Sequence, residues 1–156
     1  MFRKILVPTD GSSFSQKAYQ TAIEIGEASA AEIILLHVLY LPSSYWGYND
    51  PFPVILSQEE MDEGSENVLV STVKDVTGQN VRVRRMKKEG YPAKVILEIA
   101  QKEEVDLIVM GSHGYGPLSG TVLGSVSQRV LYGAACPVLI VKQEGKAHKP
   151  NEEENT

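Results

Sequence analysis

Three glycines and a serine in the C-terminal half of the chain have a spacing that suits phosphate binding. Gly111 is followed after two residues by Gly114, and nine residues later Gly124 is followed directly by Ser125. An apolar, strand-like run precedes this segment, and a helical pattern follows it. Glycine lets backbone N–H groups approach a ligand closely, and a helix start offers unpaired N–H groups and a positive dipole end. The spacing therefore predicts a nucleotide-binding loop.

The start of the predicted helix contributes further donors. Val126 and Ser127 follow Ser125, so their N–H groups lie in the first turn, and the two serines can add hydroxyl donors. Ser125 and Gln128 also have capping-box spacing. The two interpretations are compatible, because a phosphate can replace or share a helix cap.

Asp10 is a second candidate, because it directly follows another strand-like run that includes Ile5–Val7. In parallel sheets, ligands bind beyond the carboxyl ends of strands, and both Asp10 and Gly111 come just after such an end. If the two strands are neighbours, their loops face each other across one crevice. The alternative is that residues 10–13 form only a turn and a helix cap.

Three other reactive side chains receive structural interpretations. His113 lies within the glycine loop, where it either contacts phosphate, acts as a base, or is simply solvated or packed. His37 ends a buried strand and is interpreted as a hydrogen-bonded core histidine. Cys136 is the only cysteine, lies in an apolar context and is expected to be buried and inert. No His, Cys or carboxylate pair has metal-site spacing, so no protein metal ligands are predicted.

Hydrophobic patterns supply the elements that must position these residues. Capping-box spacing marks helix starts at Ser13 with Gln16 and at Ser57 with Glu60, and Pro92 suits the first turn of a third helix. The remaining expected elements are strands at 5–7, 33–38, 81–84, 107–110 and 138–141, a second helix that continues to about residue 76, and a last helix at 125–132. Apolar strands that alternate with helices predict a parallel sheet covered on both faces.

The whole chain limits the function. Its 156 residues suit one domain at 1–142, followed by a polar tail at 143–156 that is expected to be disordered. A net charge of −5 argues against a general nucleic-acid or anionic-membrane binder. The basic cluster at 82–88 is interpreted as a solvated strand edge. No long apolar stretch or signal-peptide pattern is present, and the single cysteine fits a reducing compartment, so we expect a cytoplasmic protein.

Five ordered segments of the sequence resemble the universal stress protein family. They are residues 5–12, 37–38, 106–114, 123–126 and 137–142, and the resemblance spans about residues 2–142. It implies an α/β fold of the adenine nucleotide alpha hydrolase-like type: a single doubly wound five-stranded parallel sheet of order 3-2-1-4-5, with helices on both faces. The glycine spacing resembles that of the nucleotide-binding branch, which implies ATP, or AMP or ADP, with Mg²⁺.

The resemblance also implies roles for individual residues. Asp10 is similar to an acidic residue that accepts hydrogen bonds from ribose, Val38 to a position whose backbone recognises adenine, and Met110 to an apolar wall. The residues implied to bind the cofactor are Pro8, Thr9, Asp10, Val38, Met110, Gly111, Gly114, Gly124, Ser125, Val126 and Ser127. The loop departs from many nucleotide-binding relatives by having Tyr115 and the small residues Ser119, Gly120 and Thr121 where those relatives carry Arg or Lys.

Three functions stay open at this point. The first is an ATP-binding universal stress protein that acts as a nucleotide-dependent sensor or switch. The second is a slow ATPase or phosphotransferase, in which Asp10 or His113 would orient water and the catalytic residues are unknown. The third is a nucleotide-independent dimeric interaction module. The resemblance implies a homodimer, and an exposed apolar edge strand invites self-pairing. That strand comprises Val138, Leu139, Ile140 and Val141.

Overall fold

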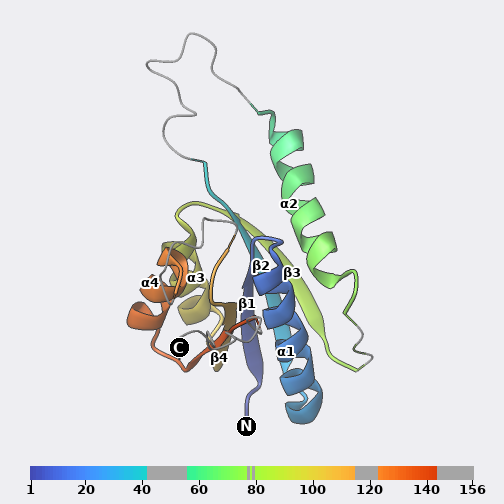
Figure 1. Ribbon diagram of the computed structural model, residues 1–156, viewed down its shortest axis with the longest axis vertical. Coiled ribbons are helices and arrows are strands. Elements are labelled where there is room, and N and C mark those ends of the chain that lie inside the picture. The colour runs from blue at the N-terminus through green and yellow to red at the C-terminus, as the bar shows by residue number, and fades with distance from the viewer. Residues whose placement is uncertain (42–55, 77, 79, 115–122, 144–156) are drawn as a thin grey trace, which may run out of the picture.

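Alternating strands and helices build one five-stranded sheet (Figure 1). The computed structural model describes residues 1–41, 56–76, 78, 80–114 and 123–143. In chain order the elements are β1 (Lys4–Thr9), α1 (Ser13–Ser29), β2 (Glu32–Leu39), α2 (Gln58–Val73), β3 (Val83–Glu89), α3 (Pro92–Lys102), β4 (Leu107–Gly111), α4 (Ser125–Gly133) and β5 (Val138–Val141). All strand pairs are parallel, and the order β3-β2-β1-β4-β5 confirms the predicted topology.

The central strands are buried on both faces, which explains their unbroken apolar sequences. Leu6 of β1 pairs with Ile34 of β2 on one side and with Ile108 of β4 on the other. All three side chains are fully buried. Because β1 lies between β2 and β4, the carboxyl ends of β1 and β4 are adjacent. This meets the condition under which the loops after these two strands share one crevice.

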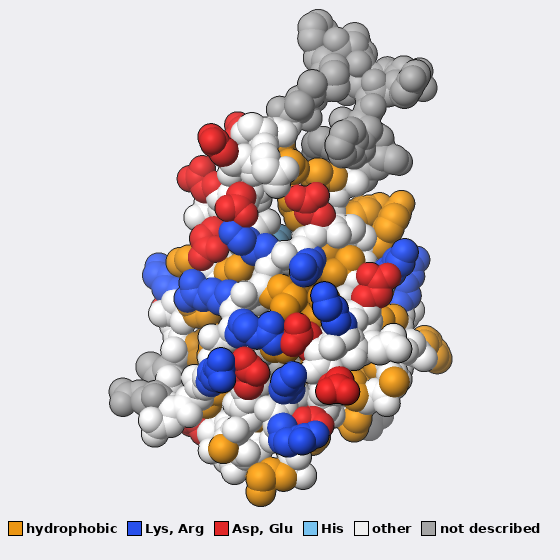
Figure 2. Space-filling model, turned by 180° about the vertical axis from the view of Figure 1, so that it is seen from behind, with side chains coloured by type: hydrophobic (Ala, Val, Ile, Leu, Met, Phe, Trp, Pro, Cys, Tyr) orange, Lys and Arg blue, Asp and Glu red, His pale blue; other side chains and the backbone are white. Residues whose placement is uncertain are grey.

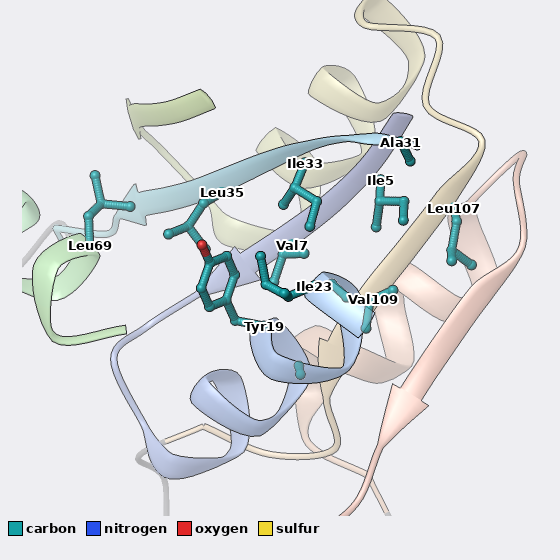
Figure 3. Packing of buried hydrophobic residues seen from close by; sticks show 12 residues of the cluster. Ile5, Val7, Tyr19, Ile23, Ala31, Ile33, Leu35, Leu69, Leu107 and Val109 are labelled. Atoms are coloured by element: carbon teal, nitrogen blue, oxygen red, sulfur yellow. The ribbon is translucent and has the colours of Figure 1, made fainter. Parts of the chain in front are cut away.

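Alternate residues of the strands feed two separate core layers. On one face, Ile5 and Val7 of β1 pack with Tyr19 and Ile23 of α1 and with Leu69 of α2, as Figure 3 shows. The opposite face carries a second cluster in which strand residues pack against α3 and α4. Helices therefore cover both faces of the sheet (Figure 1). Burial of these large side chains is the main stabilising contribution.

Helix boundaries agree with the sequence in part. Ser57 and Glu60 form the predicted reciprocal capping box, and Pro92 occupies the first turn of α3. The cap of α1 is Ser12, not Ser13: its Oγ accepts from the N–H of Ser15. This register lets the Ser12 N–H and the Ser15 hydroxyl donate to Oδ1 of Asp10. Helix α2 ends at residue 73, three residues earlier than predicted.

The edge strand β3 carries the basic cluster. It begins at residue 83 and runs on to 89, later and longer than predicted. Arg84 Nη2 donates to Glu103 Oε2 at 2.5 Å, and Lys87 Nζ lies 2.7 Å from Oδ1 of Asp62. Figure 2 shows Lys and Arg side chains interspersed with Asp and Glu on this face. The cluster is therefore a solvated, ion-paired strand edge, as the sequence indicated.

Some predictions lie outside the described residues. They concern most of the tail at 143–156 and the substitutions at Tyr115, Ser119, Gly120 and Thr121. Most of the segment at 40–56, which contains the sole tryptophan, Trp46, also lies outside the described residues. Among the helices that the structure describes, none is both long and apolar enough to cross a membrane.

Candidate functional site

A cavity of about 580 Å³ lies where the carboxyl ends of β1 and β4 meet the start of α4. This volume is in the range of small-molecule sites. The sequence-predicted residues that line it are Pro8, Thr9, Asp10, Val38, Met110, Gly111, Gly114, Gly124, Ser125, Val126 and Ser127. The fold thus brings all eleven together, although they come from four separate parts of the chain.

Seven further residues line the same cavity. They are Ser15, Leu36, Pro92, Ile96, His113, Leu123 and Gln128. Among them, His113 is the residue for which the sequence left a phosphate contact open. Leu36 could have been found from strand periodicity, because it lies two residues before Val38 and so faces the same side. Ser15 had no sequence signal beyond its place in a polar helix start.

Asp10 is held in a fixed orientation at the end of β1. Its Oδ1 accepts hydrogen bonds from the N–H of Ser12 at 2.9 Å and from Oγ of Ser15 at 3.1 Å. Its Oδ2 faces Gly114, where a Cβ would overlap the carboxylate oxygen. The turn and helix-cap contacts considered for Asp10 are therefore present, and the same residue also lines the cavity. One carboxylate serves both the turn and the site.

Gly111 is required by packing inside the protein. A Cβ at this position would lie 2.8 Å from the backbone carbon of Phe14 in α1. The carbonyl of Gly111 accepts from Oγ of Ser127 at 2.9 Å, and the carbonyl of Ser112 accepts from the same hydroxyl at 3.3 Å. This differs from the expected use of the Ser127 hydroxyl as a phosphate donor. The hydroxyl instead ties α4 to the end of β4.

The start of α4 supplies backbone donors that have no partner among the described residues. Gly124 is the N-cap residue, with extended backbone angles and no side-chain cap. Its own N–H donates to the carbonyl of Ser112 at 2.7 Å. The capping box considered for Ser125 and Gln128 does not form, because the Gln128 amide donates to the carbonyl of Leu123 at 3.3 Å. The next three N–H groups, of residues 125–127, lie in the first turn, where a helix provides no acceptor.

His113 is the basic side chain nearest to these donors. Its Nδ1 lies 3.1 Å from Oγ of Ser112, and its ring is 5.5 Å from that of Phe14. Asp10 is the other ionisable residue that lines the cavity, and the described lining includes no Lys or Arg. The described residues contain no His, Cys, Asp or Glu group that could hold a metal ion by itself.

Apolar side chains from three elements line one part of the cavity, which we call its apolar end. Leu36, Val38, Ile96 and Met110 line it from β2, α3 and β4. Leu36 and Met110 are buried, and Val38 is half-buried. The cavity therefore has an apolar end and a donor-rich end, with the Asp10 carboxylate also in its lining.

Of the two other reactive residues, His37 behaves as the sequence indicated, whereas Cys136 is half-buried and not buried as expected. His37 is buried, and its Nδ1 lies 2.9 Å from the carbonyl of Thr9, so it is a hydrogen-bonded core residue. Burial raises the pKa of the Cys136 thiol, which lowers the thiolate fraction and with it the nucleophilicity.

Comparisons with known proteins agree with this architecture. A universal stress protein MJ0531 from Methanocaldococcus jannaschii is 36% identical over 146 residues, which cover 94% of this chain and 85% of that protein. The solved structure of hypothetical protein MJ0577, from the same organism, has a TM-score of 0.78 at 32% identity and covers 93% of this chain and 99% of that chain.

A more distant structure shares the fold alone. It is a universal stress protein family protein from Arabidopsis thaliana with AMP bound, 18% identical, with a TM-score of 0.59 and coverage of 96% of this chain and 97% of that chain. The model of the universal stress protein family matches residues 1–142. With its sheet order, its glycine-lined cavity and these relatives, the chain belongs to the universal stress protein family.

Proposed function

We propose that this chain binds an adenine nucleotide in the cavity and acts as a nucleotide-dependent sensor or switch in the stress response. One observation carries the proposal: a single cavity combines three helix N–H groups that have no partner among the described residues, an oriented carboxylate and an apolar end. Phosphate oxygens need donors, ribose hydroxyls need an acceptor, and a purine ring needs apolar walls. The cavity provides each of the three.

The proposed ligand position follows from this chemistry. Phosphate lies at the N–H groups of Ser125, Val126 and Ser127, where the α4 dipole adds a favourable field. Ribose hydroxyls donate to Asp10, whose Oδ1 is already saturated by two protein donors. Adenine packs at the apolar end, beside Val38 and Met110. Pro8 and Thr9 complete the wall at the end of β1.

We propose ATP with Mg²⁺ as the ligand, with ADP and AMP as the alternatives. No Lys or Arg is present in the described lining, so the triphosphate charge would be met by N–H groups, His113 and a divalent cation. Mg²⁺ prefers oxygen ligands and is commonly held by substrate phosphates with one or two carboxylates. Asp10 is the one carboxylate placed to contribute among the described lining residues. The distant AMP-bound relative supports an adenine nucleotide for this fold.

Isothermal titration with ATP, ADP, AMP and GTP, each with and without Mg²⁺, tests the proposal. We expect saturable binding of an adenine nucleotide, and weaker binding of GTP. Absence of saturable adenine-nucleotide binding below millimolar concentration overturns it and favours the nucleotide-independent interaction module. Phosphate release above a buffer control, in protein that binds ATP, would identify the slow ATPase instead.

We also propose that the chain forms a homodimer through β5. The strand is at an edge of the sheet, and Leu139 is 37% exposed. Tyr132, near the end of the preceding α4, is 90% exposed. A two-fold axis beside this edge would bury both side chains. The one cysteine is unpaired, which favours a reducing compartment such as the cytoplasm.

A further inference from the structure

A chain of buried hydroxyl groups links α2 to the candidate site. Oγ1 of Thr72 lies 2.7 Å from Oγ1 of Thr9, which donates to Oγ of Ser15 at 3.0 Å. Oγ of Ser15 in turn donates to Oδ1 of Asp10 at 3.1 Å. Thr72, Thr9 and Ser15 are 1%, 6% and 4% exposed. Three elements, α2, β1 and α1, thus meet in one polar contact behind the Asp10 carboxylate.

Backbone groups hold the two middle members of this chain, Thr9 and Ser15, in place. The N–H of Gly11 donates to Oγ1 of Thr9 at 3.0 Å, and Oγ of Ser15 also contacts the carbonyl of Ser12 at 2.9 Å. Among the described residues, no buried side-chain nitrogen or oxygen lacks a partner. A satisfied buried network has little freedom, because any rotation of one hydroxyl leaves a neighbour unpaired in a low-dielectric region.

Thr72 has a role here that its own helix does not require. Its single hydroxyl hydrogen has two acceptors in reach, the carbonyl of Val68, four residues earlier, at 2.8 Å, and Oγ1 of Thr9 at 2.7 Å. Because Thr9 gives its own hydrogen to Ser15, the hydrogen bond between the two threonines requires Thr72 to donate to Thr9. Thr21 on α1 makes the same four-residue contact with the carbonyl of Lys17 at 3.0 Å, but it is half-buried and does not line the cavity. The contact with Thr9 thus directs the Thr72 hydroxyl away from its own helix. It brings a residue of α2 to the back of the site, although Thr72 does not line the cavity.

We propose that Thr72 is a positioning residue for Asp10. It fixes Thr9, which fixes Ser15, and these contacts hold Oδ1 of Asp10 so that Oδ2 stays turned towards Gly114 and the ligand. The inference rests on the proposed function, in which Asp10 accepts from ribose. Helix α2 contributes no residue to the described cavity lining. Under this proposal it nevertheless controls how strongly the site prefers a ribose with hydroxyls over a ribose without them.

Affinities for ATP and for its 2′,3′-dideoxy analogue test this inference. A hydrogen bond to a charged acceptor typically contributes about tenfold or more in affinity, so wild-type protein should prefer ATP by at least that factor. Thr72→Val, which keeps the shape and removes the hydroxyl, should reduce the preference about threefold or more. It should leave the affinity for the dideoxy analogue unchanged. Thr72→Ser, which retains the hydroxyl, should retain the preference.

Thr21→Val is the matched control, because it removes a helix hydroxyl with the same four-residue contact but no link to the site. Asp10→Asn should abolish the preference, and adding Thr72→Val to it should have no further effect. If Thr72→Val does not fold, Thr72→Ala removes the same hydroxyl with a residue of higher helix propensity.

The outcomes separate the inference from the function on which it rests. If wild-type protein does not bind ATP, the proposed function is overturned, and the inference with it. If wild-type protein binds ATP but the Thr72 variants keep the full preference, or lose affinity for both ligands equally, the positioning role alone is overturned. A reduced preference in Thr72→Val or Thr72→Ala, with wild-type behaviour in Thr72→Ser and Thr21→Val, supports it.

Discussion

Asp10 and Gly114 lie against each other across the candidate site, so closely that a Cβ at position 114 would overlap Oδ2 of the carboxylate. At Gly111, an added Cβ would instead lie 2.8 Å from the backbone carbonyl carbon of Phe14. Gly111 and Gly114 are therefore required for different reasons. Gly114 borders a side chain of the site, whereas Gly111 borders the backbone of α1, which cannot move aside.

This difference predicts distinct effects of two alanine substitutions. Gly111→Ala should lower the free energy of unfolding by about 2 kcal/mol or more, because β4 and α1 must separate. Gly114→Ala should cost less stability, because the Asp10 side chain can rotate, but it should weaken nucleotide binding at least tenfold. Urea unfolding and titration calorimetry measure the two effects. Gly124→Ala, whose Cβ finds ordinary contacts at 3.4 Å, is the folding control. Equal stability losses at 111 and 114 would contradict this account.

Ser127→Ala should destabilise the fold by about 1–2 kcal/mol, because it removes a buried donor from two backbone carbonyls. Ser125→Ala removes an exposed hydroxyl from the same turn and should leave stability within about 0.5 kcal/mol of wild type. Thermal or urea unfolding of both variants makes the comparison. If Ser125→Ala proves the more destabilising of the two, the hydroxyl of Ser127 does not tie α4 to β4 as described.

His113→Asn should weaken ATP binding about three- to tenfold and leave adenosine binding nearly unchanged, because His113 is the one basic residue from Gly111 to Ser125. Arg129→Gln, which removes an exposed cation one turn into α4, is the control. Titrations with adenosine, AMP and ATP give the dependence on phosphate number. An unchanged ratio of ATP to adenosine affinity would remove His113 from phosphate recognition.

Stability should fall in acid through Asp106 and Glu103. Hydrogen bonds from the N–H groups of Arg3 and Lys4 lower the pKa of Asp106, and a hydrogen bond from Arg84 lowers that of Glu103. A carboxylate with a lowered folded pKa binds fewer protons folded than unfolded. Its contribution is present above the unfolded value, about 4, and is lost as the pH falls through the folded value.

Asp106→Asn should therefore be less stable than wild type at pH 7 and should lose less stability between about pH 5 and pH 2. Denaturant unfolding across that range measures the slope. Asp75→Asn, at an exposed position after α2, serves as the comparison. A wild-type acid slope in Asp106→Asn would show that the contacts at the start of β1 do not contribute to the pH dependence.

Leu139→Asp should convert the proposed homodimer into a monomer, because it places a charge on the exposed apolar edge of β5. Val70→Asp is the matched control, since Val70 is 46% exposed on α2, at the other end of the sheet. Sedimentation equilibrium gives the mass of each variant. Wild-type protein that sediments as a monomer, or a dimer that survives Leu139→Asp, would exclude β5 as the contact.

Much of the fold and of the candidate site was predictable because its signals are local. Apolar strands such as Ile33–Leu36 have few alternatives, and the glycine spacing at 111–124 marks the loop without reference to distant residues. The contact of Thr72 with Thr9 was not predictable, because it joins residues 63 positions apart and neither has an unusual neighbourhood in sequence. The close approach of Phe14 to Gly111 was not predictable for the same reason, because it depends on how closely α1 packs on β4.

Helix caps show the limit of short patterns. Serines occupy both positions 12 and 13, and spacing alone favoured the second, whereas the turn that holds Asp10 selects the first. The Ser125 and Gln128 pair also fits a capping box, but Gly124 already has the extended backbone of a cap residue and moves Ser125 into the helix. Tertiary contacts decide between registers that sequence leaves equal.

The two outer strands of the sheet differ in a way that affects solubility in the crowded cell. Along β3, Arg84, Arg85 and Lys87 pair with carboxylates of neighbouring elements, and a second β3 laid beside this row of hydrated ion pairs would have to displace them. Such a row discourages the stacking of chains into fibres. Ordered aggregation through β3 is therefore opposed before a nucleus forms. Pairing between strands of two chains is left to the uncharged edge strand β5.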